Sequence, residues 1–262
     1  MQNWSVKDDI REYWTKRAET YDLSPGHGVA KLAEMEAWKH VITDHLGYGQ
    51  ERKALDLACG TGVMTMIMHD LRFDVTGLDF TDAMMSRAKR KAEVAQARIH
   101  FLARDAEDTY EPDESYDVII ARHLVWTLVD PGKAFAEWNR ILKPGGRLLV
   151  IDGDFVSKHW LERLMPLLDR IFGNRTDGHS LLTPEQWQAH HRILERIHFK
   201  QGVRCTDVME LLAASGFGLI RNDVGLSAIR GSRQHSSLSR NWITSHFNHR
   251  FAVSGEKRSG LV

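Results

Sequence analysis

The sequence LDLACGTG, residues 55–62, joins an apolar run to a tight turn that contains two glycines. Residues 54–58 predict a buried strand, and residues 63–71 predict a helix that starts directly after the turn. Glycine lets the backbone approach a ligand because no side chain stands in the way. The first turn of the helix directs free N–H groups to the same spot. This stretch therefore predicts a strand–turn–helix unit that binds a ligand.

Strands and helices alternate along the chain on both sides of this unit. The alternation predicts an α/β fold in which helices flank a seven-stranded, mostly parallel sheet. Residues 147–152 include four consecutive aliphatic side chains, as expected for a strand buried on both faces. The sequence Lys-Pro-Gly-Gly at 143–146 predicts a turn before that strand. The remaining strands are expected at 73–79, 99–102, 116–121, 217–224 and 250–255, and further helices at 132–142 and 206–215.

Helical segments flank this core and divide the chain into four parts. An N-terminal apolar helix face ends at the sequence Ser-Pro-Gly-His-Gly; its members are Ile10, Tyr13, Trp14, Arg17, Ala18 and Tyr21. Thr183 and Gln186 resemble a capping box at the start of another helix. We expect a helical lid at 1–48, a ligand-binding core at 49–154, a helical cap insertion at 155–200, and the completion of the core with a basic C-terminal segment at 201–262.

Composition and charge narrow the classes of partner. The 262 residues carry 35 basic and 35 acidic side chains, so net charge gives no reason to expect nucleic acid or an anionic membrane. No apolar run reaches the roughly 18 residues of a transmembrane helix, and the N-terminus does not resemble a signal peptide. The two cysteines, Cys59 and Cys205, form no disulfide framework. We expect a cytoplasmic protein with a small-molecule substrate, and a homodimer is left open.

Acidic residues follow two further strands where each strand is expected to end. A carboxylate at Asp79 can accept hydrogen bonds from two neighbouring ribose hydroxyls, as the acid about 20 residues beyond the glycine turn does in dinucleotide-binding folds. Asp105, with the adjacent backbone, can contact the edge of an adenine ring. The carboxyl ends of parallel strands meet at one edge of a sheet, so these residues predict an adenosine site.

The next strand ends beside that site. In the sequence DVIIARHLVW, residues 117–126, the side chains of Arg122, His123 and Trp126 would border a reaction centre. The glycine turn, Asp79, Asp105 and the end of this strand together predict an adenosine site with a space next to it.

Five segments of the chain resemble class I S-adenosylmethionine-dependent methyltransferases, whose fold is Rossmann-like. They are LDLACGTG (55–62), GLDFTDAMM (77–85), ARDAED (103–108), YDVIIARHLVW (116–126) and ILKPGGRLLVID (141–152). The resemblance is close over about residues 50–153 and looser for YWTKRAETYD and VMELLAASGF. Within the class, the chain is most similar to the bacterial small-molecule branch that includes ubiquinone and menaquinone methyltransferases.

The resemblance implies S-adenosylmethionine as the cofactor and assigns residues to it. The implied cofactor-binding residues are Asp56, Gly60 and Gly62 at the methionine end, Asp79 at the ribose, Phe80, Met84, Asp105 and Ala106 at the adenine, Tyr13 and Tyr21 in the lid, and Ala58, Thr61 and Arg122 around them. Ala58 departs from the family, which usually has glycine there. A methyl group is tolerated at this position if the φ angle is negative.

The acceptor side is expected beyond the methyl group. His123 and His27 are the candidate catalytic bases, because a base is needed when the acceptor must lose a proton. The expected substrate contacts are His27, Trp126, Asp152 and Phe155. His190-His191 and the pair His246 and His249 lack the spacing of a metal site, so we expect no metal.

Three other functions remain open on the sequence alone. A nicotinamide dehydrogenase can show a similar glycine turn, although the third glycine of its fingerprint is replaced here by Thr65. A methyltransferase of RNA or protein would share the cofactor site. A cofactor-binding scaffold without activity would share it too. The aromatic residues of the insertion favour a small, planar, heteroaromatic acceptor.

Overall fold

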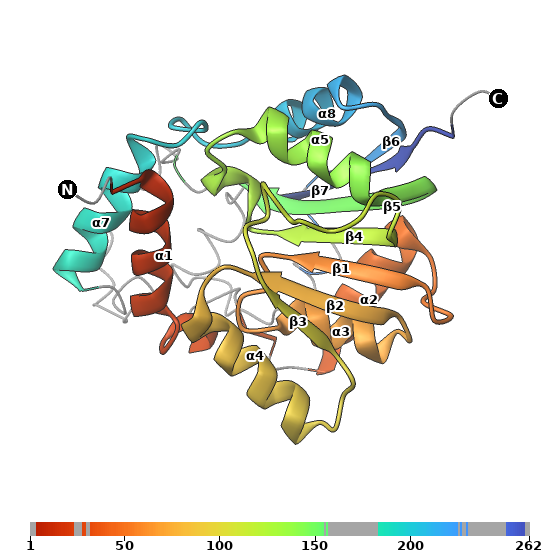
Figure 1. Ribbon diagram of the computed structural model, residues 1–262, viewed down its shortest axis with the longest axis horizontal. Coiled ribbons are helices and arrows are strands. Elements are labelled where there is room, and N and C mark those ends of the chain that lie inside the picture. The colour runs from red at the N-terminus through yellow and green to blue at the C-terminus, as the bar shows by residue number, and fades with distance from the viewer. Residues whose placement is uncertain are drawn as a thin grey trace, which may run out of the picture.

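The computed structural model describes residues 4–23, 28–29, 32–154, 156, 183–224, 226, 229 and 250–259. Within them, seven strands form one sheet in the order β3-β2-β1-β4-β5-β7-β6 (Figure 1). The strands are β1 (Lys53–Leu57), β2 (Asp74–Asp79), β3 (His100–Ala103), β4 (Tyr116–Arg122), β5 (Leu142–Gly153), β6 (Phe217–Val224) and β7 (Arg250–Lys257). β7 runs antiparallel to β5 and to β6, and all other neighbouring strands pair in parallel, so the expectation of a mostly parallel sheet is confirmed.

Helices pack on both faces of this sheet and beside the carboxyl ends of its strands (Figure 1). They are α1 (Val6–Arg17), α2 (Leu32–Leu46), α3 (Val63–Asp70), α4 (Asp82–Val94), α5 (Pro131–Ile141), α7 (Pro184–Leu194) and α8 (Cys205–Ala214), with short 3-10 helices η1 (Tyr21–Leu23) and η2 (Val125–Thr127). Successive strand residues point to opposite faces. Leu55 and Ile119 accordingly pack in the layer with α5 and α8, whereas Ala54 and Ile120 pack in the layer with α2 and α3.

The order of the strands places a crevice at the middle of the sheet. β1 pairs with β2 on one side and with β4 on the other, so the direction of the strand order reverses there. Open α/β sheets bind ligands at such a switch point, outside the carboxyl ends of the strands. Helices α1 and α7 pack against each other beside this edge (Figure 1).

Two expected boundaries differ from the structure by more than two residues. β5 begins at Leu142, five residues earlier than expected, because Leu142 pairs with Tyr116 across a register shift in β4 and β5. Gly145 adopts a φ of 74° in this stretch, so the expected turn is a bulge inside a strand. The helix expected to extend to Tyr21 ends at Arg17, and Tyr21 lies in the separate helix η1.

Much of the expected helical insertion lies outside the described residues, which resume at Thr183. There the predicted capping box is confirmed: the Thr183 hydroxyl accepts a hydrogen bond from the Gln186 amide, and the Gln186 side chain accepts one from the Thr183 amide. None of the helices in the described part of the chain is long and apolar enough to cross a lipid bilayer.

A buried histidine makes the stability of the fold depend on pH. His45 of α2 is 3% exposed, and its Nδ1 lies 2.8 Å from the hydroxyl of Ser254 on β7. Burial, reinforced by nearby Arg221, lowers the pKa of His45 below 6.5. The unfolded chain therefore binds a proton more readily than the folded chain. The stability contributed by neutral His45 is lost as the pH falls through about 6.5, and the loss levels off below the folded pKa.

Replacing His45 with glutamine is expected to flatten this part of the pH profile. Urea unfolding of the wild type and of His45→Gln, measured from about pH 8 to about pH 5, gives the difference between the two free energies. The wild type should lose more stability on acidification than the variant does. His40→Gln, an exposed change on the same helix, serves as the control and should follow the wild type. Parallel profiles for wild type and His45→Gln would contradict the prediction.

Candidate active site

A cavity with two adjoining ends lies at the carboxyl ends of β1, β2, β3 and β4. We call them the Asp105 end and the His123 end, after a residue that lines each. The two ends adjoin, because six residues line both of them: Ile10, Ala58, Asp79, Phe80, Leu124 and Thr127.

The cavity brings together most of the residues predicted for the cofactor. Asp105 and Ala106 line the Asp105 end, and Tyr21, Gly60, Met84 and Arg122 line the His123 end. The predicted cofactor residues outside this lining are Tyr13, Asp56, Thr61 and Gly62. Of the predicted acceptor residues that the structure describes, His123 alone belongs to the lining. His27 and Phe155 lie outside the described residues. Among the described residues no group of three metal-binding side chains occurs.

The glycine turn has a backbone that requires its glycines. Gly60 and Gly62 have φ angles of 55° and 81°, a region that residues with a side chain rarely adopt. A Cβ on Gly62 would lie 2.9 Å from the Cβ of Ala88 on α4, so the close packing of α3 and α4 also needs glycine. Next to Gly60, by contrast, the space is open. The turn therefore presents bare backbone to the cavity.

The expectation for Ala58 requires a correction. Its φ is 52°, not negative, so the methyl group occupies the left-handed region that glycine prefers. The chain takes this path because the amide of the next residue, Cys59, donates a hydrogen bond to the carbonyl of Leu78 on β2 at 2.9 Å. The cavity wall thus contains local backbone strain at the position where the family usually has glycine.

Replacing Ala58 with glycine is expected to stabilise the fold by about 0.5–1 kcal/mol. Removal of the left-handed alanine strain of about 1–2 kcal/mol outweighs the entropy that glycine adds to the unfolded chain. Urea unfolding measures the change. Ala54→Gly in the preceding strand, β1, is the control, because Ala54 is buried and has no positive φ, and this variant should be destabilised. If Ala58→Gly lost stability as Ala54→Gly does, the result would contradict the claim that the backbone of Ala58 is strained.

Asp79 is a buried acid in the wall of the cavity, with 5% of its surface exposed. One carboxylate oxygen accepts a hydrogen bond from the Gly60 amide at 2.9 Å, and the other accepts one from the Thr81 amide at 2.7 Å. Burial raises the pKa of Asp79, and these two hydrogen bonds oppose the rise. Each carboxylate oxygen can accept a second hydrogen bond. Asp79 therefore fixes the glycine turn and still offers acceptors to the cavity.

Asp56 lies at the end of β1 behind the turn and does not line the cavity. Its carboxylate accepts a hydrogen bond from the hydroxyl of Thr65 at 2.5 Å. Burial raises the pKa of Asp56 to about 7, although the Thr65 hydrogen bond and the charge of Arg122 lower it. The Arg122 guanidinium lies over the ring of Trp38 at 4.8 Å. Asp56 thus contributes a carboxyl group that can change protonation near neutral pH.

Aromatic side chains of the N-terminal segment cover the His123 end. Trp14 of α1 packs edge-to-face with Tyr13, Tyr21 and Trp126, with ring centroids 5.0, 5.8 and 6.4 Å apart. Trp14 and Tyr21 line the cavity, while Tyr13 supports Trp14 from behind. Burial raises the pKa of Tyr21, so its hydroxyl stays protonated at neutral pH. After Tyr21, Asp22 accepts a hydrogen bond from the Thr61 hydroxyl at 2.6 Å.

His123 has a constrained backbone at the end of β4. Its φ is 57°, its amide donates to the Ile151 carbonyl at 2.8 Å, and its carbonyl accepts from the Trp126 indole at 3.0 Å. Asp152 accepts a hydrogen bond from the Trp126 amide at 3.2 Å, and burial raises the pKa of Asp152 to about 7. Trp126 and Asp152 therefore hold the segment that carries His123, instead of lining the cavity themselves.

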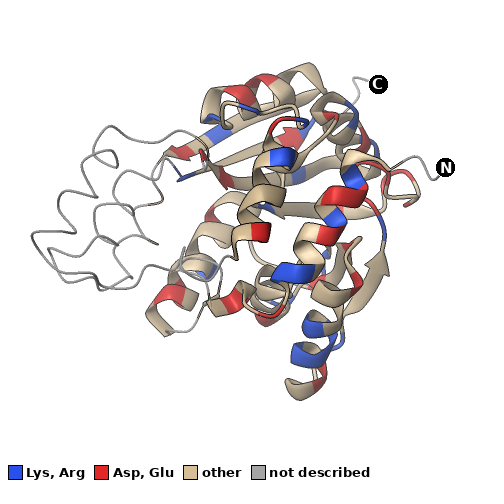
Figure 2. Cartoon of the chain, turned by 90° about the vertical axis from the view of Figure 1, so that its left-hand side faces the viewer, with Lys and Arg blue, Asp and Glu red and all other residues tan. Residues whose placement is uncertain are grey.

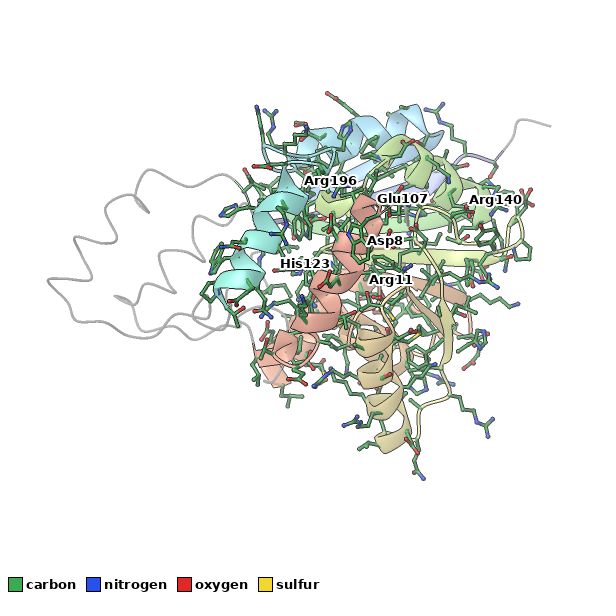
Figure 3. All side chains as sticks on the ribbon, turned by 60° about the vertical axis from the view of Figure 1, so that its left-hand side comes forward. Asp8, Arg11, Glu107, His123, Arg140 and Arg196 are labelled. Atoms are coloured by element: carbon green, nitrogen blue, oxygen red, sulfur yellow. The ribbon has the colours of Figure 1, made fainter. Side chains whose placement is uncertain are left out.

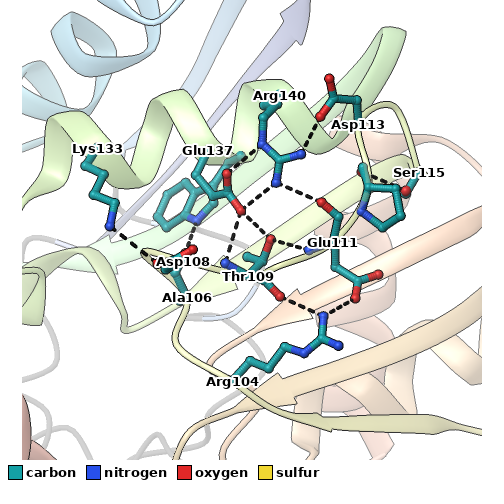
Figure 4. A network of polar contacts seen from close by, with 12 residues as sticks. Arg104, Ala106, Asp108, Thr109, Glu111, Asp113, Ser115, Lys133, Glu137 and Arg140 are labelled. Atoms are coloured by element: carbon teal, nitrogen blue, oxygen red, sulfur yellow. Dashed lines mark hydrogen bonds and ion pairs between the residues drawn. The ribbon is translucent and has the colours of Figure 1, made fainter.

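A network of ion pairs fixes the loop after β3 (Figure 4). Arg104 donates to Glu111 at 2.6 Å, and Arg140 of α5 donates to Glu137 at 2.8 Å. Glu137 in turn accepts the Thr109 amide at 3.0 Å. Inside the loop, the buried indole of Trp138 donates to the Ala106 carbonyl at 2.8 Å. The backbone at the Asp105 end is thus held from α5.

Several lining residues were not predicted as site residues. They are Lys7, Ile10, Trp14, Leu78, Thr81, Arg104, Glu107, Leu124, Thr127, Leu128 and Val129. The sequence could have indicated Glu107 and Thr127 as site residues, because each lies within four positions of a predicted site residue at a strand end. No local pattern in the sequence indicated Lys7, because its partner Asp105 is 98 residues away along the chain.

Comparison with known proteins adds independent information. Residues 55–150 match a family model described as a methyltransferase domain. The demethylmenaquinone methyltransferase of Renibacterium salmoninarum is 30% identical over 169 residues, which cover 62% of this chain and 69% of that protein. The ubiquinone/menaquinone biosynthesis C-methyltransferase UbiE of Psychromonas ingrahamii is 31% identical over 182 residues, covering 63% and 70%.

Among solved structures, geranyl diphosphate C-methyltransferase from Streptomyces coelicolor is similar in fold. The TM-score is 0.62 at 18% identity, and the match covers 98% of this chain and all of that one, 100%. The arrangement of strands and helices is therefore shared over the whole length of that enzyme.

Proposed function

This chain belongs to the class I S-adenosylmethionine-dependent methyltransferases, and from that premise we propose that it methylates a small, planar, hydroxylated aromatic acceptor. One arrangement carries the proposal. Buried Asp79 lies in the wall common to both ends of the cavity, and His123 lines the end covered by Trp14 and Tyr21. The relatives that are named for demethylmenaquinone and for quinone biosynthesis support an acceptor of this chemistry.

The residues that line the cavity fit the cofactor in chemistry. The bare backbone at Gly60 leaves room for a ligand next to the carboxylate of Asp79, which has acceptors to spare for two ribose hydroxyls. Phe80 and Met84 supply apolar surface for a flat ring, and Asp105 and Ala106 lie at the far end for its polar edge. On the methionine side, Asp56 would act from behind the glycine turn and Arg122 from the lining of the His123 end. In this proposal residues 1–48 form the lid.

The His123 end suits a flat acceptor with an acidic hydroxyl group. When bound, the cofactor supplies a methyl group on a positively charged sulfur, which is an activated leaving group. The protein's task is to align the acceptor and to exclude water, which can lower the barrier by several kcal/mol. His123 would accept the proton of the acceptor hydroxyl, so that the aromatic ring becomes electron-rich enough to attack. Trp14 and Tyr21 would stack against the ring and keep water out.

The charge distribution favours a small acceptor over nucleic acid. Lysine and arginine alternate with aspartate and glutamate on the helices that face the viewer in Figure 2. The chain as a whole carries 35 residues of each sign. Proteins that bind RNA or DNA usually concentrate cations on one face. We therefore propose a metabolite as the substrate and the cytoplasm as the place of the reaction.

Two linked measurements test this function. Titration calorimetry should show binding of S-adenosylhomocysteine and none of NADH. Transfer of a labelled methyl group should then occur to a reduced naphthoquinone that lacks its ring methyl, and not to tRNA. Binding of NADH instead of S-adenosylhomocysteine would point to a dehydrogenase. Labelled tRNA would point to a nucleic-acid enzyme, and binding without transfer to any small aromatic acceptor would support a scaffold.

A further inference from the structure

Lys7, in the first turn of α1, reaches across to the Asp105 end of the cavity. Its ammonium lies 2.6 Å from the carboxylate of Asp105 and 3.0 Å from that of Glu107. Burial alone would lower the pKa of Lys7, but the hydrogen bonds to both carboxylates raise it, so the ammonium stays charged. The Lys7 and Asp105 side chains are each 32% exposed, and the Glu107 side chain is 6% exposed. Figure 3 shows Glu107 beside the amino-terminal end of α1.

The two carboxylates do not depend on Lys7 for their positions. Asp105 accepts a hydrogen bond from the Glu107 amide at 2.9 Å. Glu107 accepts bonds from the amides of Val129, at 2.7 Å, and Asp130, at 3.4 Å. These bonds remain when Lys7 is removed, so its removal should release α1 without distorting the loop after β3.

Polar contacts of Arg11 and Asp22 also attach the N-terminal segment to the core. The Arg11 side chain donates to the Phe80 carbonyl at 3.3 Å and lies over the Phe80 ring at 5.1 Å. Asp22 accepts from Thr61 at 2.6 Å and pairs with Lys91 at 2.7 Å. From Lys7 to Asp22, the segment therefore spans the ends of β3, β2 and β1 in turn and covers the cavity along its length.

We propose that Lys7 is a positioning residue that latches α1 over the Asp105 end and so controls how long the cofactor stays bound. The proposal rests on the proposed function, because it assumes that the nucleoside occupies this end. Among the described residues, Lys7 makes the only ion pairs between α1 and the loop after β3. The latch must open before a ligand enclosed there can leave. Because two of the three partners are a third exposed, salt should weaken it.

The test is the rate at which S-adenosylhomocysteine dissociates, measured by stopped-flow fluorescence with the full chain. In the wild type, this rate should rise several-fold between about 0.05 M and about 0.5 M sodium chloride. In Lys7→Met the rate should be about fivefold higher at low salt and nearly independent of salt. Lys7→Arg keeps the charge and should restore most of the slow, salt-sensitive behaviour. A structural role alone would not produce this dependence on salt.

Lys16→Met is the matched control. Lys16 lies on the same helix, pairs with Glu12, and is 58% exposed, and it does not line the cavity. S-adenosylhomocysteine should dissociate from Lys16→Met at the same rate as from the wild type. The proposed role of Lys7 is overturned if Lys7→Met releases S-adenosylhomocysteine as slowly as the wild type or more slowly. It is also overturned if the dissociation rate of the wild type does not change with salt concentration. A wild-type protein that binds no S-adenosylhomocysteine would overturn the latch together with the proposed function.

Discussion

Asp79→Ala is expected to weaken the binding of S-adenosylhomocysteine by about 10- to 100-fold, which corresponds to about 1–3 kcal/mol. The substitution removes the acceptors proposed for two ribose hydroxyls. It also leaves the amides of Gly60 and Thr81 without their acceptor, so the glycine turn loses part of its support. Both effects act on the same ligand, and titration calorimetry measures their sum.

Asp79→Asn separates the two contributions. The amide oxygen can still accept one backbone hydrogen bond, but the side chain offers fewer acceptors and no charge. Its affinity should lie between that of the wild type and that of Asp79→Ala. Urea unfolding of each variant shows whether the fold persists. An Asp79→Ala protein that is folded and has the wild-type dissociation constant would contradict the ribose role.

His123→Asn is expected to lower turnover about 100-fold or more, while the affinity for S-adenosylhomocysteine stays the same. General base catalysis typically contributes factors of about 10²–10⁴. Asparagine is chosen because it tolerates the positive φ of this position better than most residues and keeps a polar side chain. The loss should therefore reflect the missing base and not a rearranged backbone.

His100→Asn provides the comparison for this variant. His100 is exposed at the start of β3, at the edge of the sheet opposite the cavity, and its replacement should leave turnover unchanged. Full turnover in His123→Asn would remove His123 from the mechanism. An equal loss of affinity and turnover would instead assign it to ligand binding.

The sequence was sufficient to predict the sheet and the edge where the cavity lies, because both depend on local signals. Residues 55–62 combine strand, turn and helix signals within a few positions. Asp79 and Asp105 stand at strand ends, and parallel strands bring such ends together whatever the details of packing. These residues could therefore be expected at one cavity, and the structure places both in its lining.

Features that depend on distant contacts could not be predicted in this way. The positive φ of Ala58 follows from a hydrogen bond between Cys59 and Leu78, a residue on another strand. The partners of Lys7 are about a hundred residues away along the chain. The early start of β5 depends on its pairing with Tyr116. Asp152 was expected at the substrate, and its strand-end position gave no sign that its carboxylate accepts the Trp126 amide.

The most direct test of the central claim is a crystal structure of this chain with S-adenosylhomocysteine. We expect the ribose hydroxyls within about 3 Å of the Asp79 carboxylate, the adenine between Phe80 and Asp105, and the sulfur facing His123. A ligand bound elsewhere, or one whose ribose makes no contact with Asp79, would contradict the account.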